Sequence, residues 1–231
     1  MSHLLEIDSV QKSYGQNKVL TDVYLRCETG DIVGLLGRNG SGKSTFLKIL
    51  FGAISADQKF IRIDNRILNQ PYLIDGELCY LPQDPFLPRD MKLEAAVGLY
   101  FPVEKPTSFF DDPILYDFKA CKISQLSGGE ARYAEIKLLL NSDVKFVLLD
   151  EPFNGIAPVL IETIKEMIRQ QAPYKGIILT DHDYRNVLDV ANRHFLFADG
   201  GLKPICDKEE LVFRGYMSPS AASSLNFESK Q

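Results

Sequence analysis

Residues 37–44 read GRNGSGKS, and this stretch decides the fold. It matches G-x-x-x-x-G-K-[ST] in full, between an apolar run (32–36) and a helix-like pattern (43–51), which is the context that the motif requires. The glycines let successive N–H groups face phosphate oxygens, and the following helix adds its positive end. We therefore expect Lys43 to reach the β- and γ-phosphates and Ser44 to offer its hydroxyl to Mg²⁺. The alternative, a glycine-rich turn that merely caps a helix, explains the complete motif less well.

Short apolar runs alternate with helix-period segments along the chain, which predicts an α/β fold with a parallel sheet covered by helices. Nearly continuous apolar runs predict strands buried on both faces, at 32–36, 78–81, 146–149 and 176–180. Two alternating segments predict an antiparallel pair, at 4–10 and 19–27, and a closing hairpin is expected from 193–198 and 202–206. Helices are expected at 43–51, 127–140 and 158–171.

Two adjacent carboxylates, Asp150 and Glu151, follow the apolar run that ends in FVLLD. In nucleoside triphosphatases with this loop, Mg²⁺ needs an acidic partner at the end of a neighbouring buried strand, which predicts that role for Asp150, directly or through a bound water. Glu151 can then face the γ-phosphate and act as general base toward the attacking water. For an isolated Asp-Glu pair a helix start or a solvated turn would be the better explanation, and the phosphate loop reverses that balance.

Gln83 and His182 follow predicted strands in the same way. Alone, each has an ordinary explanation, as a loop amide and as a hydrogen-bonded histidine at a strand end. Ligands of open parallel sheets bind beyond the carboxyl ends of the strands, and the phosphate loop, the two carboxylates, Gln83 and His182 all fall at such ends. Their convergence predicts one site.

The stretch LSGGE, residues 126–130, opens the helix expected at 127–140. Ser127 with Glu130 is a capping box that would start any helix. A cap does not explain Gly128 and Gly129, because each glycine inside a helix costs roughly 0.5–1 kcal/mol relative to alanine. Glycines there suit close approach of an anion to the helix N-terminus.

Taken together and in this order, the motifs resemble those of the ATP-binding subunits of ABC transporters, over about residues 4–217. The resemblance implies a P-loop NTPase fold: a RecA-like core with an N-terminal antiparallel β-subdomain and a small helical subdomain. It implies ATP and Mg²⁺ as cofactors, Tyr14 as the ring that stacks on adenine, and Glu151, His182 and Gln83 as catalytic residues. The implied magnesium residues are Ser44, Gln83 and Asp150. The implied ATP-binding residues are Tyr14, Gly37, Arg38, Asn39, Gly40, Ser41, Gly42, Lys43, Ser44, Thr45, Ser127, Gly128 and Gly129.

The resemblance also implies partners: a second nucleotide-binding subunit, most simply in a head-to-tail homodimer with two ATP molecules at its interface, and transmembrane permease subunits. The signature of one copy would close the ATP site of the other, and the chain would be cytoplasmic and peripheral on the inner face of the cell membrane. The stretches DEPFNGIAP and TDHDYRNVLDVANR are most similar to the branched-chain amino acid importer and lipopolysaccharide-transport subunits.

The segment from Asp84 to about Ser124 is rich in proline and aromatic residues and contains no convincing strand, so a mainly helical insertion is expected. With the helix that follows, it corresponds to the family's helical subdomain, about residues 84–140, within a single domain of residues 1–217. Four of its residues are candidates either for docking a short helix of the membrane subunit or for the subdomain's own core: Phe86, Leu87, Tyr100 and Phe101. Residues 218–231 are expected to form a polar, frayed tail.

The 231-residue chain is 45% hydrophobic and carries a net charge of −5 without a dense basic run, which argues against nucleic acid as a partner. No run approaches the ~18 apolar residues of a spanning helix, so the chain is expected to be neither exported nor membrane-spanning. The four cysteines form no C-x-x-C pair and are expected to be reduced, mostly buried thiols.

Two rival functions remain at this stage. A soluble ABC-type ATPase of translation or DNA repair usually has tandem cassettes or a long coiled-coil insertion, and neither is present here. A nucleotide-gated module that does not hydrolyse ATP is disfavoured by Lys43, Glu151 and His182.

One position departs from the family pattern. Most members have an aspartate where this chain has Ala157, in the loop that links the two ATP sites of the dimer. Before Pro158, an aspartate would also cap the next helix, and alanine forgoes about 1 kcal/mol of that stabilisation. The sequence therefore predicts an active ATPase with looser coupling between its two sites.

Overall fold

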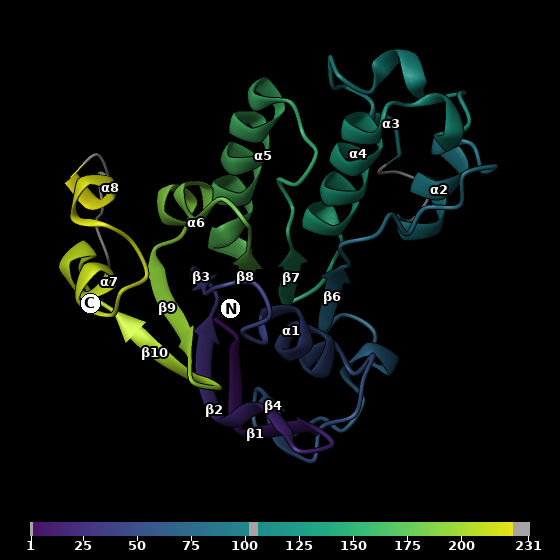
Figure 1. Ribbon diagram of the computed structural model, residues 1–231. Coiled ribbons are helices and arrows are strands. Elements are labelled where there is room, and N and C mark those ends of the chain that lie inside the picture. Colours follow the sequence, from purple (N-terminus) through teal and green to yellow (C-terminus); the bar gives the residue numbers. More distant parts are fainter. Residues whose placement is uncertain (1, 102–105, 224–231) are drawn as a thin grey trace.

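The computed structural model describes residues 2–101 and 106–223, which form two sheets flanked by helices (Figure 1). A six-stranded sheet has the order β10-β9-β3-β8-β7-β6, in which β10 is antiparallel to β9 and the others are parallel. A four-stranded antiparallel sheet has the order β2-β1-β4-β5. The strands are β1 Leu4–Tyr14, β2 Asn17–Glu28, β3 Ile32–Leu36, β4 Gln58–Ile63, β5 Arg66–Ile67, β6 Leu78–Leu81, β7 Phe146–Asp150, β8 Gly176–Thr180, β9 Arg193–Ala198 and β10 Gly201–Ile205.

Every strand expected from the sequence is present, with ends that differ by a few residues, and β4 and β5 are additional. The helices are α1 Lys43–Phe51, α2 Leu93–Tyr100, α3 Pro106–Phe109, α4 Gly128–Asn141, α5 Pro158–Gln171, α6 Tyr184–Val190, α7 Lys208–Phe213 and α8 Pro219–Ser223. The three expected helices correspond to α1, α4 and α5. Helix α4 begins one residue later than expected because Ser127 is its N-cap.

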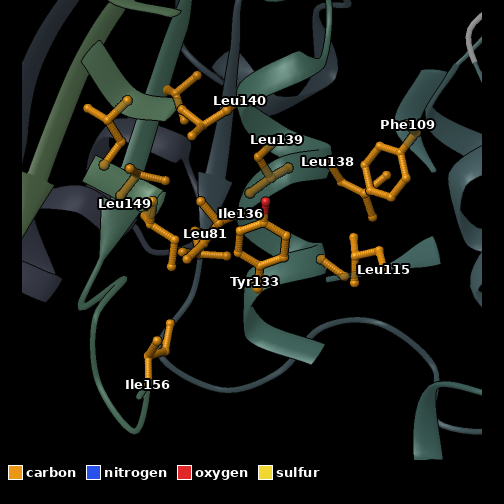
Figure 2. Close-up of a cluster of buried hydrophobic side chains, with 14 of the residues drawn as sticks. Leu81, Phe109, Leu115, Tyr133, Ile136, Leu138, Leu139, Leu140, Leu149 and Ile156 are labelled. Carbon is orange, nitrogen blue, oxygen red and sulfur yellow. The ribbon is translucent and has the colours of Figure 1, made fainter. Parts of the chain in front are cut away.

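The parallel strands are continuous apolar runs because both faces of the sheet are covered. In β7, Val147 and Leu149 belong to a cluster with α4 and α5, whereas Leu148 belongs to a cluster with α1 and the antiparallel sheet. Alternate residues of a strand point to opposite faces, so a strand between two clusters is apolar on both faces until the polar residue at its carboxyl end. Figure 2 shows the first cluster, in which Tyr133 and Ile136 of α4 lie between β-sheet leucines and the helical region.

The helical insertion is confirmed. Residues 84–101 and 106–124 contain α2, α3 and two 3₁₀ turns, and the described part contains an isolated bridge between Lys92 and Lys122 but no strand. Of the four candidate docking residues, Leu87 and Phe101 are buried in the subdomain core. Phe86 is half-buried and Tyr100 is exposed, with their rings 6.3 Å apart.

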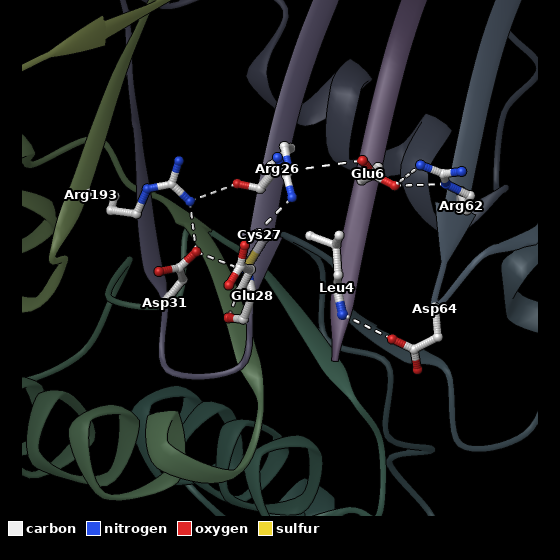
Figure 3. A network of polar contacts seen from close by, with 9 residues as sticks. All are labelled: Leu4, Glu6, Arg26, Cys27, Glu28, Asp31, Arg62, Asp64 and Arg193. Atoms are coloured by element: carbon white, nitrogen blue, oxygen red, sulfur yellow. Dashed lines mark hydrogen bonds and ion pairs between the residues drawn. The ribbon is translucent and has the colours of Figure 1, made fainter. Parts of the chain in front are cut away.

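A network of charged side chains joins the two sheets (Figure 3). Glu6 of β1 pairs with Arg62 of β4 on one side and with Arg26 of β2 on the other. Arg193 of β9 donates Nη1 to the Arg26 carbonyl at 2.8 Å and to Asp31 at 2.6 Å. These contacts connect the antiparallel sheet with β9 and with the residue before β3 of the six-stranded sheet.

The end of the described chain differs from expectation. The prediction of a frayed tail from residue 218 is wrong for residues 219–223, which form α8 with Ala222 buried against Leu211 and Met217. Residues 224–231 of the predicted tail lie outside the described residues. The signal was weak because the helix is one turn long and contains serine and alanine, which also suit a loop.

All four cysteines are free, as expected, although one is fully buried, two are half-buried and Cys206 is exposed. Their predicted burial is therefore right for Cys27 and wrong for Cys206. Within residues 2–101 and 106–223, no helix combines the length and the apolar character that a membrane span needs.

Candidate functional site

The carboxyl ends of three central strands meet at one edge of the sheet. Thr180 of β8 pairs with Leu35 of β3 and with Asp150 of β7, so the turns that follow these strands are neighbours. A cleft of about 420 Å³ opens there. It is lined by Val19, Asn39, Gly40, Ser41, Gly42, Lys43, Ser44, Thr45, Gln83, Glu151 and His182. The structure therefore brings together most residues that the sequence assigned to one site.

The loop from Gly37 to Thr45 wraps the inner end of the cleft. Gly40 and Gly42 have φ values of 77° and 104°, in the left-handed region that favours glycine. Gly42 also begins helix α1, and a Cβ there would lie 2.9 Å from the side chain of Leu20. Close packing and backbone conformation both explain this glycine.

Lys43 lies over its own loop. Its Nζ donates to the carbonyls of Gly37 at 2.7 Å and Arg38 at 3.2 Å. Burial lowers the pKa of Lys43, while the nearby carboxylates of Glu151 and Asp150 raise it. The ammonium group is thus held at the floor of the cleft by the first turn of the loop.

Asp150 is fully buried directly beneath the loop. Its Oδ1 accepts from Ser44 Oγ at 2.9 Å and its Oδ2 from the Tyr80 hydroxyl at 2.8 Å. Burial raises the pKa of Asp150, and the two hydroxyl donors lower it. Gln83 Nε2 donates to the same Ser44 Oγ at 3.2 Å. Sequence reasoning missed Tyr80, which lies inside a strand and carries no motif.

This donor set fits a magnesium ion. Mg²⁺ prefers oxygen ligands, and the hydroxyl, carboxylate and amide groups of Ser44, Asp150 and Gln83 are linked through Ser44 Oγ. No cluster of three or more histidine, cysteine or acidic side chains suited to a metal occurs in the described ranges. A site of this kind therefore needs oxygen atoms from water and from the phosphates as further ligands.

The backbone changes direction at Glu151, directly after the strand that ends in Asp150. Its φ is 52°, a left-handed conformation that is uncommon outside glycine, and its N–H donates to the Thr180 carbonyl at 2.9 Å. The turn brings Glu151 Oε1 to 2.9 Å from His182 Nε2, and both side chains line the cleft. Asp150 and Glu151 thus face different surroundings although they are adjacent in sequence.

Arg132 of helix α4 connects the segment that precedes Gln83 with the end of strand β7. Its Nη1 donates to the Pro82 carbonyl at 2.6 Å, and its Nη2 donates to the carbonyls of Asp150 at 2.9 Å and Glu151 at 3.2 Å. The side chain is 7% exposed. One guanidinium therefore connects the segment before Gln83 with the backbone of Asp150 and Glu151.

Glu135, one turn further along α4, completes this connection. Its Oε2 accepts from Arg132 at 3.3 Å, and its Oε1 accepts from the N–H groups of Phe86 at 2.7 Å and Leu87 at 3.1 Å. The backbone after Gln83 is thus fixed to α4 as well. Sequence reasoning missed this pair, although an arginine and a glutamate three apart on an otherwise apolar helix face were a visible signal.

Asp181 links the segments that follow β7 and β8. It is buried, and its carboxylate accepts from the N–H groups of Phe153 and Asp183, both at 3.0 Å. Burial raises the pKa of Asp181, and these two backbone donors lower it. The residue holds the loop after Glu151 beside the loop that carries His182.

Some predicted residues lie outside the cleft. Tyr14 is 54% exposed with Lys12 Nζ 5.1 Å from its ring centre, and it does not line the cleft. Its strand pairs with β2, which contributes Val19 to the cleft wall. Gly37 and Arg38 belong to the loop but do not line the cleft either.

The signature residues, 126–130, do not line the cleft. Ser127 and Glu130 form the predicted capping box, with distances of 2.8 and 3.3 Å. A Cβ at Gly128 would meet nothing within 4 Å, and one at Gly129 would meet its nearest atom at 3.8 Å. The fold of this chain therefore does not require either glycine.

The comparisons with known proteins agree with this geometry. The family described as ABC transporter matches residues 20–154. The lipopolysaccharide export system ATP-binding protein LptB of Acidithiobacillus ferridurans is 33% identical over 225 residues, which cover 92% of this chain and 93% of that protein. LptB of Haemophilus influenzae is 32% identical over 211 residues, covering 85% of this chain and 88% of that protein.

The fold also recurs among solved structures. One described as the structure of an ATP-binding subunit of an ABC transporter superposes with a TM-score of 0.78 at 22% identity, covering 95% of this chain and 98% of that one. A nucleotide-free ATP-binding cassette from an ABC transporter superposes with a TM-score of 0.74 at 23% identity, covering 96% and 98%. At this identity the likeness shows the fold alone.

Proposed function

The chain belongs to the family of ABC transporter ATP-binding proteins, and from that membership we propose how its cleft binds and hydrolyses ATP. The chain is an ATPase that powers a transporter, which the relatives favour over a soluble ATPase of translation or DNA repair. Hydrolysis also sets aside the nucleotide-gated module. The similarity to two lipopolysaccharide-export proteins supports a place in that branch of the family.

The phosphates of ATP bind the loop from Gly37 to Thr45. Residues 39–45 of the loop, Lys43 included, line the cleft, where the positive end of α1 favours anions. Ser44, Asp150 and Gln83 would hold Mg²⁺, which when bound would neutralise the charge that develops on the transferred phosphoryl group. Tyr14 stacks on adenine from the edge of the antiparallel sheet.

The single observation that supports this mechanism is that the two adjacent carboxylates at the end of β7 have different partners. Asp150 is sealed beneath Ser44, whereas Glu151 is turned by its left-handed backbone into the cleft, 2.9 Å from His182. Glu151 accepts the proton of the attacking water as general base. His182 holds the Glu151 carboxylate in place.

The chain works as a head-to-tail homodimer bound to transmembrane permease subunits. Ser127, Gly128 and Gly129 are the residues that close the partner copy's ATP site, which gives the two glycines a purpose that the single chain does not. The permease contacts the helical subdomain, about residues 84–140, beside Phe86 and Tyr100. This places the chain in the cytoplasm, peripheral on the inner face of the membrane.

Hydrolysis of ATP by the purified chain, followed as phosphate release with Mg²⁺ and with excess EDTA, tests the proposal. We expect turnover with Mg²⁺ and its loss with EDTA, and Lys43→Met should abolish ATP binding in a calorimetric titration. Equal turnover in EDTA would remove the magnesium site, and normal ATP binding by Lys43→Met would remove the phosphate-loop assignment.

A further inference from the structure

The last residue of β8, Thr180, carries the only polar side chain of that strand. The residue is fully buried, and its hydroxyl oxygen has no hydrogen-bond partner among the described residues. A buried hydroxyl without a partner is destabilising, and valine has the same branched shape without a hydroxyl. Packing of the nucleotide-free chain therefore gives no reason for a threonine at the end of β8.

Thr180 lies beside Asp150 on the same face of the sheet. The two residues are paired in register on neighbouring parallel strands, which are about 4.8 Å apart. Two residues before them, Ile178 and Leu148 both belong to the apolar cluster that includes α1. Since alternate residues of a strand share a face, the side chains of Thr180 and Asp150 also lie on the α1 side of the sheet. This is the side on which Ser44 of α1 contacts Asp150.

The carboxylate of Asp150 can accept more hydrogen bonds than its two hydroxyl donors supply. Oδ1 accepts from Ser44 at 2.9 Å and Oδ2 from Tyr80 at 2.8 Å, whereas a carboxylate has about four acceptor positions. Rotation of Thr180 about its Cα–Cβ bond exchanges the hydroxyl with the methyl group or the hydrogen atom on Cβ. The neighbouring strand can thus supply a third hydroxyl donor to Asp150.

The backbone of Thr180 is already fixed within the site. Its carbonyl accepts from the Glu151 N–H at 2.9 Å. The next residue, Asp181, accepts from the N–H groups of Phe153 and Asp183. A change confined to the γ-oxygen of Thr180 removes none of these contacts, so its hydroxyl can be tested separately from the position of the backbone.

A carboxylate that serves a metal ion is oriented by the groups that hydrogen-bond to it. We propose that Thr180 is a positioning residue of the magnesium site, whose hydroxyl donates to the Asp150 carboxylate in the Mg-ATP complex and thereby raises the affinity for Mg²⁺. The inference rests on the proposed function, because it takes Asp150 and Ser44 as magnesium residues. It gives a purpose to a hydroxyl that the nucleotide-free chain does not use.

Thr180→Val tests the proposal in the full chain, because it replaces the hydroxyl with a methyl group and keeps the branched shape. Titration calorimetry with ATP in a Glu151→Gln background, in excess Mg²⁺ and in excess EDTA, measures binding without turnover. We expect the Kd in Mg²⁺ to rise about tenfold while the Kd in EDTA stays unchanged, because groups that orient a metal ligand typically contribute about 10- to 100-fold. Thr180→Ser restores the hydroxyl and should return the Kd in Mg²⁺ to that of the parent.

Urea unfolding of the nucleotide-free chains distinguishes this role from packing. Thr180→Val should unfold at the same or a higher urea concentration than the parent, because it removes an unpaired buried hydroxyl. A lower unfolding midpoint, with Kd values raised equally in Mg²⁺ and in EDTA, would show a purely structural role and overturn the proposal. Thr163→Val, at an exposed position of α5, is the matched control and should leave both Kd values unchanged.

Two further outcomes separate this inference from the proposed function. An unchanged Kd in Mg²⁺ for Thr180→Val would overturn the positioning role and leave the ATP site intact. If the parent with Thr180 intact bound ATP equally well in Mg²⁺ and in EDTA, the magnesium site itself would be wrong, and the positioning role with it.

Discussion

The phosphate-loop half and the signature half of the molecule are built on opposite principles. In the first, Ser44, Asp150, Glu151 and His182 contact one another within one chain. In the second, the residues around Gly129 contact nothing that would need a glycine. The side chains of the phosphate-loop half hold one another in place within the single chain. The glycines of the signature have no packing role within the chain, which indicates a surface that contacts another molecule.

The largest effect should follow from removing the proposed general base, Glu151, in the phosphate-loop half. Glu151→Gln keeps the shape of the side chain and loses its ability to accept a proton, and general bases contribute about 10²–10⁴-fold. We expect ATP turnover to fall at least about 100-fold while the Kd for Mg-ATP changes little. Phosphate release and calorimetry measure the two quantities.

Glu94→Gln on α2, whose nearest charged partner is Lys92 at 3.7 Å, is the control for that change. It should leave turnover of the isolated subunit as it is. Unchanged turnover in Glu151→Gln would mean that the left-handed turn at residue 151 does not serve the reaction.

The second effect concerns the buried pair Arg132 and Glu135, because Arg132 follows the signature by two residues and contacts the backbone of Pro82, Asp150 and Glu151. Arg132→Met leaves the Glu135 carboxylate without its cation and removes one donor from each of the carbonyls of Pro82, Asp150 and Glu151. Removing one partner of a buried pair costs about 3–5 kcal/mol, so we expect about 3 kcal/mol less free energy of unfolding in urea.

Adding Glu135→Gln to Arg132→Met separates charge from geometry. The glutamine oxygen can still accept from Phe86 and Leu87, so the double variant should recover about 1 kcal/mol or more if the unpaired charge dominates. Arg66→Met, at an exposed position of β5, serves as the surface control. A loss below about 1 kcal/mol in Arg132→Met would show that the pair does not hold the segments together.

The third effect tests the signature half directly. Gly129→Asp adds a carboxylate that meets no atom of its own chain closer than 3.8 Å at Cβ. Stability of the isolated chain should therefore be nearly unchanged. If the signature closes on the phosphates of a second copy, like-charge repulsion worth about 2 kcal/mol should lower ATP turnover about 30-fold.

Gly98→Asp is the matched helical glycine outside the signature, since its Cβ would also meet nothing within 4 Å. It should leave ATP turnover of the isolated subunit intact. Full activity of Gly129→Asp would contradict the head-to-tail dimer, because a phosphate approaching that helix would meet the new charge.

The same contrast explains what the sequence could predict. GRNGSGKS, the two carboxylates and the ends of strands are local signals, and the structure places Lys43, Ser44, Gln83, Glu151 and His182 around one cleft. Strand β4 escaped notice because half of the residues in QKFIRI are polar or charged, and because the strand lies between β1 and β5 in the smaller sheet. Its burial alternates, and its exposed face is paired through Arg62 and Glu6.

Contacts over long sequence separations were beyond the sequence alone. Tyr80 and Arg132 act through backbone or buried groups of other segments, and no spacing rule connects them with their partners. The Ser127 capping box was predictable because its two members are three residues apart. Pairs separated by 18 to 70 residues need the folded chain.

The smallest effect is expected at Ala157, which follows Glu151 by six residues and precedes helix α5. Ala157 has extended backbone angles of −63° and 142° at the N-cap of α5, and its side chain makes no cap. An aspartate at this position would accept from the first free N–H groups of α5, beside Pro158 at the first helical position. We expect Ala157→Asp to raise the free energy of unfolding in urea by about 1 kcal/mol, with Ala157→Val as the control that cannot cap.

If this loop also links two ATP sites, the dependence of turnover on ATP concentration should become steeper in Ala157→Asp. A stability gain with an unchanged Hill coefficient would confine the residue to capping, because an aspartate that contacted the second site would change both quantities.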